Sequence, residues 1–182
     1  MPLSEELLDI YDSCGNAVNK TKPRSQVHRD GDWHRTVHVW IVNSKDELLL
    51  QKRSMEKESH PGLWDISSAG HIAAGQSSID AAVREVQEEL GLIIFPGELN
   101  FAFTLRNQCV VNNVGFIDNE ISDVYIIKRD IIISDLHLQK SELSDVKFVH
   151  YKTLEDMLET CPEIFVPHEE EYKKLFGILE FL

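Results

Sequence analysis

Apolar residues occur along this chain in short runs that polar turn residues separate. Short β-branched or aliphatic runs between turn signals predict strands, whereas apolar residues three and four positions apart predict helices. The N-terminal LLDIYDSCGNAV predicts a hairpin around residues 13–16, where Cys-Gly-Asn offers turn chemistry. The patterns together predict a mixed α/β (α+β) fold with strands over 36–43, 47–53, 63–70, 99–106, 124–129 and 146–152, and helices over 153–160 and 168–182.

A further helix is predicted over residues 78–90. Ser77 and Asp80 fit a capping box at its start, and Gly91 suits the position just past its end. Helical spacing places its apolar residues on one stripe that would face the core. These residues are Ile79, Ala82, Val83, Val86 and Leu90.

Three glutamates gather on the neighbouring stripe of this helix. Glu85, Glu88 and Glu89 stand at positions i, i+3 and i+4, where like charges repel by a few tenths of a kcal/mol. A solvated acidic face is the simplest interpretation, but it does not explain why Arg84 and two glycines stand in register with the glutamates. Carboxylate oxygens on one rigid element suit Mg²⁺ or Mn²⁺, which would relieve the repulsion.

Residues 70–92, GHIAAGQSSIDAAVREVQEELGL, resemble a Nudix box. That pattern is Gly, five residues, Glu, seven residues, then Arg-Glu-apolar-x-Glu-Glu-x-Gly-apolar. The resemblance implies a single Nudix domain over 1–182, an α/β/α sandwich with a mixed β-sheet, the box helix on one face and a hairpin extension over 1–33. Matching positions are Gly70, Arg84, Glu85, Val86, Glu88, Glu89, Gly91 and Leu92.

One box position departs from the family pattern, because Gln76 stands where the first glutamate is expected. In the family this glutamate pairs with the box arginine and holds the preceding loop on the helix. Gln76 can still accept a hydrogen bond from Arg84, without the added strength of a charged acceptor. We expect a weaker clamp with the metal site retained.

The resemblance implies hydrolysis of a nucleoside diphosphate linked to another moiety, or of a related organic diphosphate, by a metal-activated water. Glu85, Glu88, Glu89 and the backbone carbonyl of Gly70 would ligate Mg²⁺ or Mn²⁺, and Arg84 would orient the glutamates. The leaving group stays open, since loops set the pockets of this superfamily.

Candidates for the general base and for phosphate binding follow from the same resemblance. The base would be Glu85 or Glu120, and Glu120 is expected in a loop before the strand at 124, where it could also be an ordinary exposed residue. Lys52 and Arg53, at the end of a predicted strand, are candidates for direct phosphate contact, although paired basic residues also occur at solvated strand ends. Trp64 is expected in the core.

A narrower resemblance runs through residues 34–72. This segment is similar to isopentenyl diphosphate isomerase and its Nudix relatives, where a histidine opens the first strand, Arg-Ser follows the second, and Pro-Gly-x-Trp leads to Gly-His. The isomerase has a catalytic cysteine before Gly-His, and Ala69 stands there. Because the box also keeps Glu85 and Glu88, we expect a hydrolase on an isomerase-like frame. The alternatives are an isomerase and a non-catalytic, ligand-sensing module, which Gln76 slightly favours.

The isomerase-type metal site uses histidines and acidic residues, and His34, His71, Asp118 and Glu120 occupy comparable positions. His28 is close to the pattern but one residue out of register. Such a set suits a zinc- or manganese-like ion. For each histidine the favoured interpretation is nevertheless a polar surface or strand residue, since without isomerase chemistry the site has no known purpose. No role is assigned to His38, His60, His137, His150 or His168.

The charge composition of the chain limits the kinds of binding partner that we expect. A net charge of −13 disfavours nucleic acid and anionic membranes, whereas an acidic protein can still bind a small-molecule diphosphate through metal ions. With no apolar run of about 18 residues and an acidic N-terminal segment, we expect a cytoplasmic protein. Cys14, Cys109 and Cys161 form no CxxC pair and are expected to be reduced thiols without a special role. A homodimer is an expectation at the level of the family only.

Overall fold

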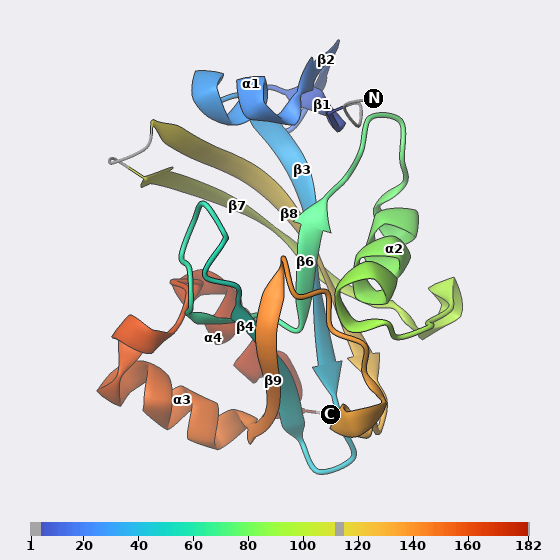
Figure 1. The fold of residues 1–182 in the computed structure, drawn as a ribbon, viewed down its shortest axis with the longest axis vertical. Helices are drawn as coiled ribbons and strands as arrows, with labels where there is room; N and C mark the ends of the chain where they lie inside the picture. The colour runs from blue at the N-terminus through green and yellow to red at the C-terminus, as the bar shows by residue number, and fades with distance from the viewer. Residues whose placement is uncertain (1–4, 112–114, 182) are drawn as a thin grey trace.

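The computed structural model describes residues 5–111 and 115–181, and within them nine strands form one mixed sheet with helices on both sides (Figure 1). The strands are β1 (Leu7–Tyr11), β2 (Ala17–Pro23), β3 (Trp33–Val42), β4 (Glu47–Arg53), β5 (Trp64–Asp65), β6 (Ser68–His71), β7 (Asn100–Val111), β8 (Phe116–Lys128) and β9 (Leu143–His150). The helices are α1 (Arg24–Asp30), α2 (Ser78–Leu90), α3 (Tyr151–Thr160) and α4 (Glu169–Leu179), with short 3₁₀ turns at Pro96–Glu98, Ile133–Asp135 and Pro162–Ile164.

Strand β3 is the centre of the sheet. It pairs in parallel with β8 over its whole length, from Trp33 opposite Asn119 to Val42 opposite Lys128. Antiparallel pairing joins it to β1, β4 and β6. Residues that are far apart in sequence are therefore brought together around one strand.

The two faces of β3 are covered by different helices. Val37, Val39 and Ile41 pack in a buried cluster with α2, whereas Trp40 and Val42 pack in a second cluster with α3 and α4. Alternation along a strand sends successive side chains to opposite faces, so one strand serves both cores. The arrangement is an α/β/α sandwich with the predicted box helix on one face, which confirms the predicted fold class (Figure 1).

Helix α2 has the predicted bounds and caps. The hydroxyl of Ser77 accepts a hydrogen bond from the backbone N–H of Asp80 at 3.1 Å. Gly91 ends the helix in the left-handed region with φ +66°, and a Cβ there would lie 2.6 Å from Cβ of His137. Both the conformation and the close neighbour therefore require glycine at this position.

The N-terminal hairpin is confirmed as β1 paired with β2, but α1 was not predicted from the sequence. Its seven residues bury one apolar side chain, Val27, and so carry no helical periodicity. The predicted strand over 63–70 is divided into β5 and β6, because the chain leaves the sheet ladder at Ile66 and Ser67. The hydroxyl of Ser67 there accepts a hydrogen bond from the N–H of Ile41.

The predicted boundaries near two later strands were wrong. β8 begins at Phe116, eight residues before the predicted start, so Glu120 lies within a strand and not in a loop. Its first residues, FIDNE, are two apolar residues followed by three polar ones, so they lack the apolar–polar alternation that indicates a strand. The predicted strand over 146–152 ends at His150. The ring of His150 accepts a hydrogen bond from the N–H of Lys152 and so caps the start of α3.

The cysteines and helices add two observations. Cys14 is exposed, Cys161 is half-buried, and both are free, while the side chain of Cys109 lies outside the described residues. In the part of the chain that the structure describes, no helix has the length and apolar character needed to cross a bilayer.

Candidate active site

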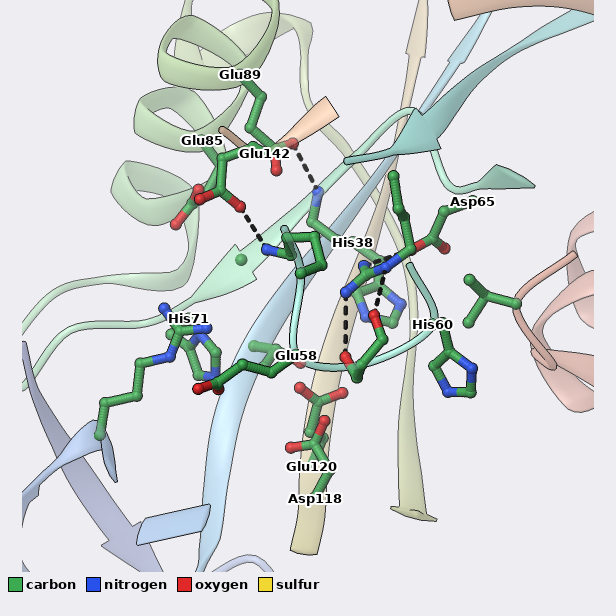
Figure 2. Close-up of a pocket in the computed structure, with 18 of the residues that line it drawn as sticks. His38, Glu58, His60, Asp65, His71, Glu85, Glu89, Asp118, Glu120 and Glu142 are labelled. Carbon is green, nitrogen blue, oxygen red and sulfur yellow. Dashed lines mark hydrogen bonds and ion pairs between the residues drawn. The ribbon is translucent and has the colours of Figure 1, made fainter. Parts of the chain in front are cut away.

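A cavity of about 850 Å³ opens between α2, the loop over residues 54–63, strands β3 and β8, and the segment 166–168 (Figure 2). Residues proposed from the sequence converge on it from separate elements. Those that line it are Gly70, Arg84, Glu85, Glu88, Glu89, Arg53 and Glu120. Lys52 lies elsewhere, with its Nζ 5.8 Å from the ring centroid of the half-buried Trp64.

Gly70 and Glu85 meet at the point where β6 passes α2. A Cβ on Gly70 would lie 2.5 Å from Oε2 of Glu85 and closer still to its other carboxyl atoms. Only glycine lets the backbone approach the glutamate this closely. The carboxylate of Glu85 is therefore held against the main chain of β6, as a ligand set combining the Gly70 carbonyl with Glu85 would need.

The three box glutamates differ in their surroundings. Burial raises the pKa of Glu85 to about 7, although Arg84 opposes this rise. Burial also raises the pKa of Glu89 to about 8, although Glu89 accepts hydrogen bonds from the Ser68 hydroxyl at 2.7 Å and the Ala69 N–H at 3.2 Å. Glu88 is half exposed. The two buried carboxylates thus lack sufficient positive charge nearby, which a divalent cation would supply.

Arg84 fastens the box loop to the helix. Its guanidinium contacts Oε1 of Glu85 at 2.7 Å and Oε2 of Glu88 at 3.1 Å. It also donates to the backbone carbonyl of His71 at 2.8 Å and to Oε1 of Gln76 at 3.3 Å. The hydrogen bond expected between Arg84 and Gln76 is present, and it is the longest of these contacts.

A second group of side chains of metal-binding types borders the same cavity, which its members His71, Asp118 and Glu120 line. His28, His34 and His71 have ring nitrogens within 4.8 Å of one another, and so do the ligand atoms of His34, Asp118 and Glu120. Nε2 of His28 lies 3.2 Å from Nε2 of His71. His28 reaches the cluster because α1 turns the chain between β2 and β3, so the apparent offset in sequence register has no structural effect.

Two atoms of this histidine cluster are buried without a hydrogen-bond partner among the described residues. They are Nε2 of His34 and Oδ1 of Asp118, which lie 3.5 Å apart. Nδ1 of His34 lies 3.1 Å from the carbonyl of Asp32 and donates to it, which leaves Nε2 with a lone pair. Burial lowers the pKa of both His34 and His71, so both rings are held neutral. Neutral imidazoles and carboxylates facing one another fit a transition-metal ion.

Arg53 is already engaged by the protein. Its guanidinium donates to Oδ2 of Asp65 at 2.9 Å and to the carbonyl and hydroxyl oxygens of Ser59 at 3.1 Å each. Asp65 is buried and also binds Nε2 of His168 at 2.9 Å. Arg53 therefore holds the cavity loop onto β5, and only part of its donor capacity faces the cavity.

Three histidines to which the sequence analysis assigned no role line the cavity: His38, His60 and His168. His38 points from β3 into the polar site, and its Nδ1 lies 2.8 Å from Oε2 of Glu171 on α4 (Figure 2). The partners are 133 residues apart, and neither belongs to a motif. The only local signal was a histidine flanked by apolar residues in TVHVWIV.

Known proteins resemble this chain over most of its length. Residues 32–168 match the family model described as NUDIX domain. "Nudix hydrolase 3" of Arabidopsis thaliana is 44% identical over 97% of the chain, which spans only 24% of that relative. An "Uncharacterized Nudix hydrolase" of Listeria monocytogenes is 36% identical over 81% of each protein.

Two further proteins are similar to this chain at lower sequence identity. An "Isopentenyl-diphosphate Delta-isomerase" of Paenarthrobacter aurescens is 28% identical over 89% of the chain and 85% of that protein. A crystal structure from Deinococcus radiodurans shares the fold with a TM-score of 0.65 and 21% identity, over 86% of this chain and 90% of that one.

Proposed function

We propose that this chain, which belongs to the NUDIX domain family, is a metal-dependent hydrolase of organic diphosphates such as a nucleoside diphosphate linked to another group. The observation that carries the proposal is the pair formed by the buried Glu89 and the largely buried Glu85, whose side chain is 12% exposed, on one side of a large polar cavity. A neutral ligand would not offset the cost of ionising these carboxylates, whereas a cation bridging them to phosphate oxygens would.

Glu85, Glu88, Glu89 and the carbonyl of Gly70 would hold the cation. When bound there, Mg²⁺ or Mn²⁺ would neutralise phosphate charge and lower the pKa of a coordinated water. Arg84 keeps Glu85 and Glu88 on the cavity side of α2 through its two ion pairs. Arg53 would contact the substrate only with the donors that Asp65 and Ser59 leave free, and Lys52 would have to turn from Trp64 to do so.

The proton acceptor is assigned to Glu85 or Glu120. Burial raises the pKa of both carboxyl groups, and Asp118 raises that of Glu120 further. Glu120 lies 4.0 Å from Nε2 of His34, so its role is tied to the histidine cluster. The pH dependence of kcat in the Glu85→Gln and Glu120→Gln variants separates the two, because removal of the base abolishes the acidic limb.

The histidine cluster is proposed as a second cation site, supported by its two orphaned atoms. An isomerase function has less support, since Ala69 stands at the position of the catalytic cysteine and its methyl group cannot exchange a proton. Metal content of purified protein, compared with that of a His34→Ala variant, tests the second site independently of any activity.

The primary test is phosphorus NMR with Mg²⁺ or Mn²⁺ in oxygen-18 water, against nucleoside diphosphate derivatives and prenyl diphosphates. We expect metal-dependent cleavage with label in one phosphate product. Glu88→Gln and Glu89→Gln should each abolish turnover, whereas Glu159→Gln on the exposed face of α3 should not. Equal activity in all three variants would remove the box from the mechanism, and ligand binding without cleavage by the unmodified protein would favour the sensing alternative.

A further inference from the structure

His38 lies in the middle of β3, where the sheet forms the wall of the cavity. In the ladder between β3 and β6 it stands opposite Ala69, and both residues line the cavity. The N–H of Ala69 donates to Glu89, so His38 is one strand away from a carboxylate of the box. The histidine is therefore close to where a metal-bound diphosphate would lie.

The orientation of the His38 ring is fixed from α4. Nδ1 binds Oε2 of Glu171 at 2.8 Å, while the other oxygen of Glu171 accepts from Nε1 of Trp40 at 2.8 Å. The Glu171 side chain is 1% exposed, so both of its oxygens are satisfied inside the protein. With Nδ1 engaged, Nε2 is the ring atom that His38 can offer to a ligand.

The charges around His38 favour its protonated form. Burial alone disfavours an imidazolium, but the charge of Glu171 and the hydrogen bond to it outweigh burial and raise the pKa of His38. The other titratable groups facing it are Asp65 on β5, Asp118 on β8 and His168 before α4, whose ring centroid lies 5.5 Å away. The ion pair with Glu171 therefore favours the form in which both ring nitrogens carry protons, and in that form Nε2–H is a donor.

A purely structural ion pair is the alternative. Buried ion pairs add little net stability, because removing two charges from water offsets their attraction. An apolar pair of similar volume would join α4 to β3 equally well, as Trp40 and Leu175 already do within one buried cluster. Packing alone does not require a charged ring at a position that lines the cavity.

We infer that His38 donates a hydrogen bond from Nε2–H to a phosphate oxygen of the bound diphosphate, and that Glu171 is the positioning residue that fixes this donor. The inference rests on the proposed function for its substrate class. It adds to the cavity a cation that the protein itself contributes. It also makes α4 part of the active site.

Binding can be tested without turnover. In the full chain with Mg²⁺, methylenediphosphonate serves as a diphosphate that cannot be hydrolysed, and nitrogen-15 NMR reports each imidazole nitrogen. We expect the Nε2 resonance of His38, assigned by its loss in His38→Gln, to shift on addition of the probe, while Nδ1 stays bonded to Glu171. An unchanged Nε2 resonance would overturn the inference, whether or not the protein hydrolyses any diphosphate.

Kinetics supply the second test. We expect His38→Ala to lower kcat about 10²–10³-fold, the loss typical of one donor to developing charge, with little change in metal affinity. His38→Gln, which keeps an N–H donor, should recover part of this loss, and Glu171→Gln should fall between the unmodified protein and His38→Ala. The matched control is His150→Gln at the start of α3, which should leave kcat unchanged. A folded His38→Ala protein with the kcat of His150→Gln would show that the histidine is structural only.

The two proposals fail in different ways. If Glu88→Gln abolishes turnover while His38→Ala does not change it, the hydrolase proposal holds and the inference about His38 is wrong. If no diphosphate is cleaved by the unmodified protein but Nε2 of His38 responds to methylenediphosphonate, the hydrolase proposal is wrong and the contact with His38 stands.

Discussion

Replacing Gly70 by alanine should disable the site without unfolding the protein. The new Cβ would lie 2.5 Å from Oε2 of Glu85 and closer to the other two carboxyl atoms, where a normal contact is about 3.5 Å. The Glu85 carboxylate would therefore have to move by about 1–1.5 Å. The flexible side chain of Glu85 can turn away, so the fold should be kept while the carboxylate is displaced from its position as a metal ligand. A displacement of about 1 Å in a catalytic group lowers the rate about 10²-fold.

The assay measures kcat by formation of the two monophosphate products, followed by phosphorus NMR at saturating Mg²⁺, together with Mn²⁺ affinity by titration calorimetry. Gly97→Ala is the matched control, since a Cβ on Gly97 would meet nothing within 4 Å. We expect Gly70→Ala to lose about 10²-fold in kcat and to bind Mn²⁺ more weakly, while Gly97→Ala behaves as the unmodified protein. Thermal unfolding of both variants checks that the fold is kept.

One result would refute the reasoning about Gly70. If Gly70→Ala were to turn over substrate and bind Mn²⁺ as Gly97→Ala does, the close approach of β6 to Glu85 would have no part in holding the cation. The Gly70 carbonyl would then also be removed from the proposed ligand set.

Three further predictions concern stability. Gly177 is an exposed position inside α4 with free space around it, so Gly177→Ala should stabilise the protein by about 0.5–1 kcal/mol, seen by calorimetry as a Tm rise of about 1–4 °C. Glu89 has a pKa of about 8 when folded and 4.5 as its reference, so the folded state holds a proton that the unfolded chain has lost. Stability of the metal-free protein should therefore fall as pH rises from about 4.5 to about 8, and Glu89→Gln or added Mg²⁺ should flatten this slope. Gln76→Glu should strengthen the clamp on Arg84 and raise stability by about 0.5–1 kcal/mol, measured by urea unfolding, whereas an unchanged midpoint would show that the charge is screened.

The parts of the fold that the sequence predicts well are those with local causes. Helix α2 has its predicted bounds because Ser77, the apolar stripe and Gly91 act within a few residues of one another. The contact between Gly70 and Glu85 joins two residues that both belong to the box pattern. Helix α1 was missed because one buried valine makes no periodicity, and the sequence therefore did not show how α1 places His28 beside His34 and His71.

Pairings between distant segments could not be predicted. Nothing in the sequence connects His38 with Glu171, because the contact depends on how α4 packs against β3. Arg53 was expected to face phosphate, yet its partners Ser59 and Asp65 lie on a loop and a strand whose positions are set by the sheet. Such contacts arise from tertiary packing, which a pattern within one element does not record.

The central strand also protects the fold against mispairing. Along β3, Thr36 and His38 line the polar cavity and His34 lies beside Asp118 and Glu120, whereas Val37, Val39 and Ile41 face the core under α2. A slip of one residue against β8 would exchange these two sets, burying imidazoles against leucine and valine and exposing aliphatic side chains in the cavity. His34 and His38, which are proposed to bind cation and phosphate, thus also specify which strand alignment can fold, so selection for catalysis and selection against misfolding act on the same two positions.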